Sequence, residues 1–150
     1  MDEYSTALAA AVEAALPAWV RRCVISRLTA AGGVTTPAAE ELIAAAQAAA
    51  VQETVPELRA LLEIDVDLQR TNPLAVLRRA VRFPTGVLAE LGVPPIRRTE
   101  FEQQQFPDDV YGLAPATWSD IDESVHEPGL FWGAWKAKTV LDRRRDEGKR

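Results

Sequence analysis

The sequence predicts an all-α fold, and three observations support this. Apolar residues recur at spacings of three and four through most of the first 92 residues, which is the period of a helix that buries one face. No segment shows a convincing period-two alternation, which a half-buried strand would need. Glycine and proline residues separate the periodic stretches at places where helices ordinarily begin and end.

The first helix is expected from about Asp2 to Ala31, with Gly32 and Gly33 as its stop. Pro17 lies inside this helix and removes one hydrogen bond, so a kink or a break is expected near Leu16. Its predicted apolar stripe consists of Leu8, Val12, Ala15, Trp19 and Cys23, completed by Ser26 or Arg27.

A second helix is expected from Thr36-Pro37, which reads as an N-cap followed by proline at the first helical position, to about Thr54. Pro56 is expected to start a further helix. The second helix carries a face of mostly small side chains, namely Leu42, Ala45, Ala46, Ala49 and Ala50. Small residues allow close helix approach, or leave space for a ligand.

Asn72-Pro73 is the clearest helix start in the chain, and Gly92 is the matching stop. Pro84 is expected to break this stretch in the middle. The scaffold over residues 1–92 is therefore predicted to be an irregular helical bundle whose helices are interrupted by proline.

The last third of the chain has a different composition. Eight of the ten aromatic residues lie between Phe83 and Trp135, and every formally charged side chain over 99–128 is acidic. Thr99–Gln105 suggests a helical turn or two, and residues 107–113 suggest a loop or a short helix. Thr117 with Asp120 resembles a capping signal for a short helix over about 118–124. An irregular stretch of this length is usually functional or disordered, and its aromatic residues argue against disorder. We expect an ordered strap across the helical core.

These observations predict a single domain over residues 1–150. It divides into a helical scaffold (1–92), the strap (93–128), a C-terminal helix (129–146) that carries Phe131, Trp132 and Trp135, and a basic tail (147–150).

Composition narrows the classes of function. The formal charge of −5 argues against nonspecific nucleic-acid binding. A single cysteine excludes an intramolecular disulfide and fits a reducing compartment. The acidic start is unlike a signal peptide, and no apolar run reaches the length of a membrane span. We expect a cytoplasmic protein, and the sequence offers no nucleotide or cofactor motif.

Three stretches carry a family resemblance: Asn72–Val81, Phe106–Trp118, and His126–Lys138. Over roughly residues 70 to 146 the chain resembles a family of small uncharacterised actinobacterial helical proteins. No activity, ligand or partner is attached to that family. The resemblance therefore implies a bacterial, intracellular protein and transfers no functional residues.

The leading functional hypothesis is a non-enzymatic protein that binds another protein or itself as a homodimer. Tryptophan is favoured at the centres of interfaces, and one small core cannot easily bury every ring of the final helix. The candidate anchors are Trp118, Trp132, Trp135, Phe131 and Tyr111.

A second hypothesis is a small-ligand or anion-binding protein. Arg78 and Arg82 share a helix face at a spacing of four residues, and Arg79 is adjacent. Their guanidinium groups could bind an anion at the mouth of a cavity formed by the alanine-rich face of the second helix. The same groups could meet a phosphate backbone, but no helix-turn-helix pattern or RNA-binding motif supports that reading.

A third hypothesis is a carboxylate-based hydrolase with a divalent metal. Its candidate ligands are Asp108, Asp109, Asp120 and Asp122, but they do not fit the calcium-loop template. Capping, or pairing with Arg97-Arg98 or the basic C-terminus, explains these side chains more simply. His126 is the only histidine and Cys23 lies on an apolar stripe, so we predict no catalytic residue and no metal site.

Overall fold

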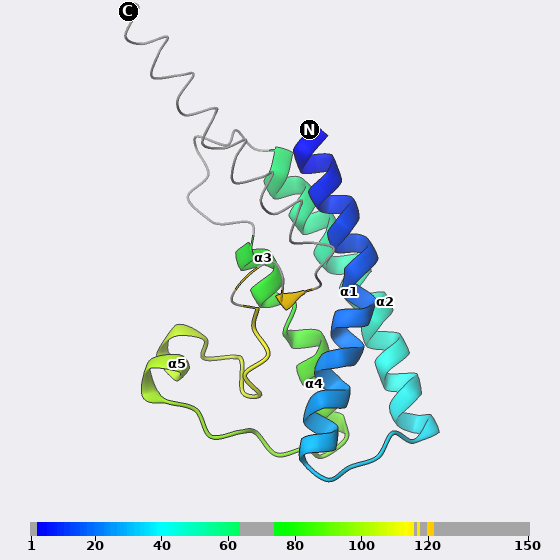
Figure 1. The fold of residues 1–150 in the computed structure, drawn as a ribbon, viewed down its shortest axis with the longest axis vertical. Helices are drawn as coiled ribbons and strands as arrows, with labels where there is room; N and C mark the ends of the chain where they lie inside the picture. Colours follow the sequence, from blue (N-terminus) through cyan, green and yellow to red (C-terminus); the bar gives the residue numbers. More distant parts are fainter. Residues whose placement is uncertain (1–2, 64–73, 116, 118–119, 122–150) are drawn as a thin grey trace, which may run out of the picture.

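The computed structural model describes residues 3–63, 74–115, 117 and 120–121, and for Tyr4 the backbone alone. Within this part the chain has no strand, and the all-α prediction is confirmed. Helix α1 (Glu3–Ala30) and helix α2 (Pro37–Glu63) form a long antiparallel hairpin (Figure 1). No described helix combines the length and the apolar character that a membrane span requires.

Two short helices complete the bundle. Helix α3 (Leu74–Arg79) contacts α2, and helix α4 (Arg82–Glu90) contacts both α1 and α2. Helix α5 (Glu100–Gln105) stands apart from the bundle at one side of the molecule (Figure 1). The helix start at Asn72-Pro73, the C-terminal helix and the basic tail lie outside the described residues.

Helix termini follow the sequence signals. The Gly33 amide donates to the Leu28 carbonyl over 2.9 Å and closes the last turn of α1. The Thr36 hydroxyl accepts from the Ala39 amide at 3.1 Å and caps α2. Gly92 ends α4 with φ at +74°, a conformation that glycine adopts without the clash of a Cβ atom.

The helix break predicted at Pro56 is wrong, and α1 is not broken at Pro17, because each helix runs through its proline. Proline removes one backbone hydrogen bond, but the helix on each side of it is buried in the core. Leu16 and Val20 flank the first proline, and Val55 precedes the second; all three side chains are buried. Tertiary packing therefore outweighs the local preference for a break.

The chain does leave the helix ahead of Pro84. Helix α3 ends at Arg79 and α4 begins at Arg82, which places Pro84 in the first turn of α4. The missing proline N–H has no intrahelical partner at that position, so the residue is tolerated there. The Phe83 amide instead donates to the Ala80 carbonyl over 3.1 Å.

The buried surface of α1 is wider than the predicted stripe. Leu8, Val12, Ala15 and Trp19 are buried as expected, and Cys23 is half-buried. Five further apolar residues of α1 are also buried: Ala9, Leu16, Val20, Val24 and Leu28. The reason is that α1 packs against α2 and α4 together, so more than one face is covered.

The segment after α4, residues 93–115, is named here the return segment. It lies within the predicted strap and contains one regular element, α5. Tyr111 anchors it, since its ring is 2% exposed and its hydroxyl donates to the Val93 carbonyl at 2.6 Å. The Ile96 amide donates to the Val110 carbonyl over 3.1 Å and joins the two limbs of the segment.

Asp109 satisfies the backbone amides of the return segment. Its carboxylate is 5% exposed and accepts from the Leu113 amide at 2.7 Å and the Ala114 amide at 2.8 Å. Such a carboxylate caps a turn in the way that an N-cap side chain caps a helix.

Arginine side chains donate hydrogen bonds to the backbone carbonyls of the return segment. The Arg98 guanidinium donates to the carbonyls of Glu102 and Asp109, and to that of Phe106 at 2.6 Å. Arg78 of α3 donates from Nε to the Pro115 carbonyl at 3.2 Å. The irregular segment therefore has hydrogen-bond partners that no regular element provides.

We predict that Asp109→Ala destabilises the fold by about 2–4 kcal/mol, because two partly buried amides lose their acceptor. Equilibrium urea unfolding followed by circular dichroism measures the change. The matched control is Asp108→Ala at the exposed neighbouring carboxylate, expected within about 0.5 kcal/mol of the parent. Equal stability losses in the two variants would contradict this role for Asp109.

Candidate functional site

A cavity of about 550 Å³ lies between the α3–α4 corner and the return segment. This volume is in the range that holds small organic ligands. We name it the cationic cavity. It is lined by Arg78, Arg79, Val81, Arg82, Thr85, Gly86, Ala89, Gln105, Phe106, Pro107, Asp108, Asp109 and Ala114.

Two arginines of the cavity are held by aromatic rings. The Arg78 Cζ atom lies over the Phe106 ring, 5.5 Å from its centroid, and the Arg82 Cζ atom lies 4.5 Å from the Phe83 centroid. A guanidinium lying over a ring uses its face and leaves N–H groups at its edge free to donate. The rings therefore restrict both cations without neutralising them.

The three arginines of the cavity differ in whether their guanidinium groups already form an ion pair. Arg79 pairs with Glu57 of α2. Among the described residues neither Arg78 nor Arg82 takes part in an ion pair. Arg82 donates to the Arg79 carbonyl at 3.1 Å, and Arg78 donates to a carbonyl through Nε. Arg78 and Arg82 are consequently the cations best placed to meet an incoming anion.

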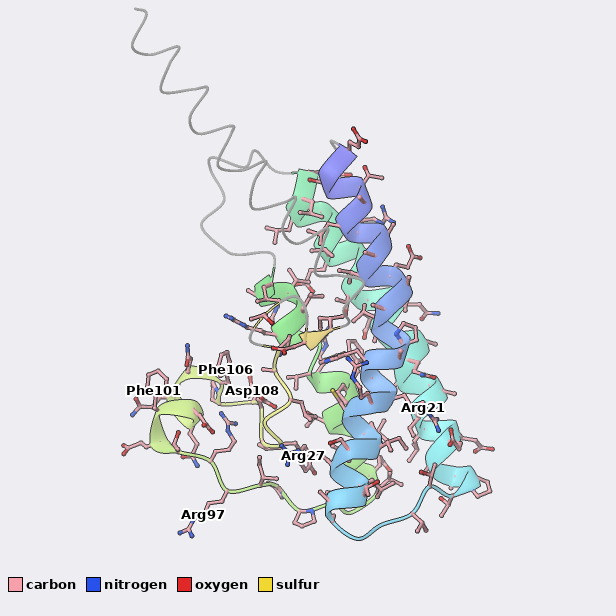
Figure 2. All side chains as sticks on the ribbon, viewed as in Figure 1. Arg21, Arg27, Arg97, Phe101, Phe106 and Asp108 are labelled. Atoms are coloured by element: carbon pink, nitrogen blue, oxygen red, sulfur yellow. The ribbon has the colours of Figure 1, made fainter. Side chains whose placement is uncertain are left out.

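The cavity also contains negative charge. Asp109 turns its carboxylate to two backbone amides, whereas Asp108 is exposed. Phe106 and Asp108 lie between α5 and the helical bundle (Figure 2). Asp108 is the one carboxylate among the described lining residues that can oppose a bound anion directly, against three guanidinium groups.

The lining combines guanidinium donors with apolar side chains. Among the described lining residues there is no histidine, cysteine or lysine, and Thr85 is the single hydroxyl. The Thr85 Oγ1 atom is buried and has no hydrogen-bond partner in the described structure, and no general base stands beside it. Guanidinium donors beside an apolar wall fit an anion with an apolar body.

The structure brings the predicted Arg78, Arg79 and Arg82 together at a cavity, but not at the predicted one. The alanine-rich face of α2 is only partly covered: Ala50 is fully buried and Ala46 packs against the same core, whereas Ala45 is exposed. Helix α1 packs against α2, so the buried small residues serve close helix packing.

Of the five interaction anchors predicted from the sequence, the structure describes only Tyr111. Tyr111 is wrong as a surface anchor, since its ring is buried and its hydroxyl is bonded inside the fold. The other four, Trp118, Phe131, Trp132 and Trp135, lie outside the described residues. Phe101, which is 71% exposed on α5, is not among the anchors predicted from the sequence.

The described carboxylates do not assemble a metal site. No group of three or more histidine, cysteine, aspartate or glutamate side chains gathers in the part of the chain that the structure describes. Asp109 is occupied by amides, and Asp120 accepts from the Thr117 amide at 3.0 Å. Asp122 and His126 lie outside that part. Asp109 and Asp120 act as turn caps.

Cys23 is a core-facing thiol. It lines a smaller hollow with Arg22 and Arg27 and packs against the main core cluster. Burial raises the pKa of its thiol to about 12, and the nearby arginines offset that only in part. The thiolate is the reactive form, so this environment does not favour a nucleophile.

The chain matches no known protein family, no curated protein and no solved structure. The resemblance to actinobacterial helical proteins therefore stays a prediction, and the function must be argued from the cavity itself.

We predict that Cys23 is alkylated by iodoacetamide at pH 8 at least tenfold more slowly in the folded protein than in guanidinium. A thiol with a pKa of about 12 is far less ionised at this pH than one at the ordinary value near 9. Mass spectrometry of quenched samples gives both rates. Equal rates would show that the thiol is not desolvated in the fold.

Proposed function

We propose that this protein binds a small anionic ligand with an apolar body in the cationic cavity, without catalysing a reaction. The observation that carries the proposal is the pair Arg78 and Arg82. Both line one cavity, both are held over aromatic rings, and neither has a carboxylate partner among the described residues.

The chemical class of the ligand follows from the walls. Two guanidinium groups suit a carboxylate or a phosphate monoester, which accept paired N–H donors. Val81, Ala89 and Pro107 contribute apolar surface to the same cavity. A purely inorganic anion would leave that surface against water, whereas a neutral apolar ligand would leave the guanidinium groups unpaired.

A second candidate function is protein–protein interaction, with another protein or with a second copy of this chain. One observation supports it: Phe101 is an aromatic side chain that the fold leaves 71% exposed. Aromatic side chains are enriched in the cores of protein–protein interfaces, so an exposed ring can anchor a partner.

Phenyl phosphate is a direct probe of anion binding. We predict that it binds the folded protein more tightly than either inorganic phosphate or benzyl alcohol, since only phenyl phosphate meets both the guanidinium groups and the apolar wall. Isothermal titration calorimetry gives the three affinities. Equal or absent binding of all three compounds would overturn the proposal.

Three single variants locate the site. We predict that Arg82→Ala weakens phenyl phosphate binding about tenfold, since one charge-assisted hydrogen bond is lost. Asp108→Asn should strengthen it, because a repelling carboxylate is removed from the lining. The control is Arg97→Ala, an exposed arginine that points away from the cavity (Figure 2). A loss in Arg97→Ala as large as that in Arg82→Ala would mean nonspecific charge attraction.

A further inference from the structure

The structure presents Phe101 on a loop that is held by its own hydrogen bonds. We name residues 98–109 the Phe101 loop. Thr99 caps α5, because its hydroxyl accepts from the Glu102 amide at 3.2 Å. Arg98 lies inside the loop and donates to three of its carbonyls. A loop ordered in this way loses little conformational entropy when it binds.

The outer side of this loop is unpartnered. Helix α5 has no buried residue, and Phe101 lies on the side of α5 that faces away from the bundle (Figure 2). Glu100 and Glu102 flank it, and neither forms an ion pair within the described part of the chain. The surface is therefore an exposed aromatic ring between two carboxylates. Its chemical complement is an apolar hollow edged by cations.

The same chain carries such a hollow. The cationic cavity offers apolar walls, and its Arg78 and Arg82 lack carboxylate partners among the described residues. The loop and the cavity adjoin, because Gln105 ends α5 and also lines the cavity. When one chain carries both a projection and its complement, a two-fold rotation can pair them reciprocally between two copies.

We propose that two copies of this chain form a reciprocal dimer in which the Phe101 ring of each copy enters the cationic cavity of the other. Glu100 and Glu102 of the entering loop then face Arg78 and Arg82 of the receiving cavity. This inference rests on the proposed function, since both require the cavity to accept a group that is anionic and partly apolar.

The dimer is expected to be weak, because each contact is one aromatic anchor with a few charges and is smaller than a standard stable interface. Light scattering over roughly 10 μM to 1 mM should show the mass rising with concentration and levelling at twice that of one chain. The rise should shrink at high salt, which screens the carboxylate–guanidinium attraction. A constant single-chain mass, or growth beyond two chains, overturns the reciprocal dimer.

Two single variants at exposed apolar side chains test the anchor. Phe101→Ala should abolish the concentration dependence of the mass, with an unchanged circular dichroism spectrum, because the ring does not belong to the core. Val34→Ala is the matched control, since Val34 is 77% exposed on the loop between α1 and α2. It should associate as the parent does. Association of Phe101→Ala equal to that of the parent overturns the proposal.

The receiving site is tested by photo-crosslinking. With benzoylphenylalanine at position 101, irradiation should give a covalent dimer, and mass spectrometry should map its crosslink to residues 78–89. Crosslinks that map only elsewhere overturn the assignment.

Phenyl phosphate separates this inference from the proposed function. It should dissociate the dimer, because it occupies the same cavity, and Phe101→Ala should bind it as the parent does. If the parent stays monomeric but binds phenyl phosphate through Arg82, the dimer is overturned and the proposed function stands. If the parent stays monomeric and does not bind the probe, both proposals are overturned.

Discussion

The irregular segment after α4 depends on side chains that replace the hydrogen bonds of regular structure. Its carbonyls accept from guanidinium groups, three of them from Arg98 and one from Arg78. Farther along, Arg22 of α1 donates to the carbonyls of Asp120, at 3.1 Å, and Ile121, at 2.5 Å. Guanidinium suits this task because it offers five N–H donors, keeps its charge and lies readily against neighbouring atoms.

This use of arginine decides which cations remain for a ligand. Arg98 donates its hydrogen bonds to backbone carbonyls, and Arg79 forms an ion pair with Glu57. Arg78 donates one hydrogen bond to a carbonyl, from Nε, and Arg82 also donates one hydrogen bond to a carbonyl. The cavity is therefore positive because neighbouring arginines differ in their partners, and two of them have no carboxylate partner among the described residues. The number of arginines alone would not make it positive.

The same segment builds both surfaces that we assign to function. Its inner side, from Gln105 to Asp109, closes the cationic cavity against α3 and α4. Its outer side carries Phe101. Because Arg98 and Asp109 order both sides together, a change in the interior of the loop would alter the cavity and the exposed ring at once. Both surfaces depend on a few partly buried polar contacts beside the apolar cluster around Tyr111.

The sequence by itself determined the helical class, the helix ends at Gly33, Thr36 and Gly92, and the grouping of Arg78, Arg79 and Arg82, because each follows from local spacing and backbone preference. Only the tertiary structure decided that helices continue through Pro17 and Pro56, that Tyr111 is buried, and that the cavity lies beside Phe106. These outcomes depend on contacts between residues far apart in the chain. A local pattern records which residue prefers a helix or a surface, but not which distant side chain will cover it.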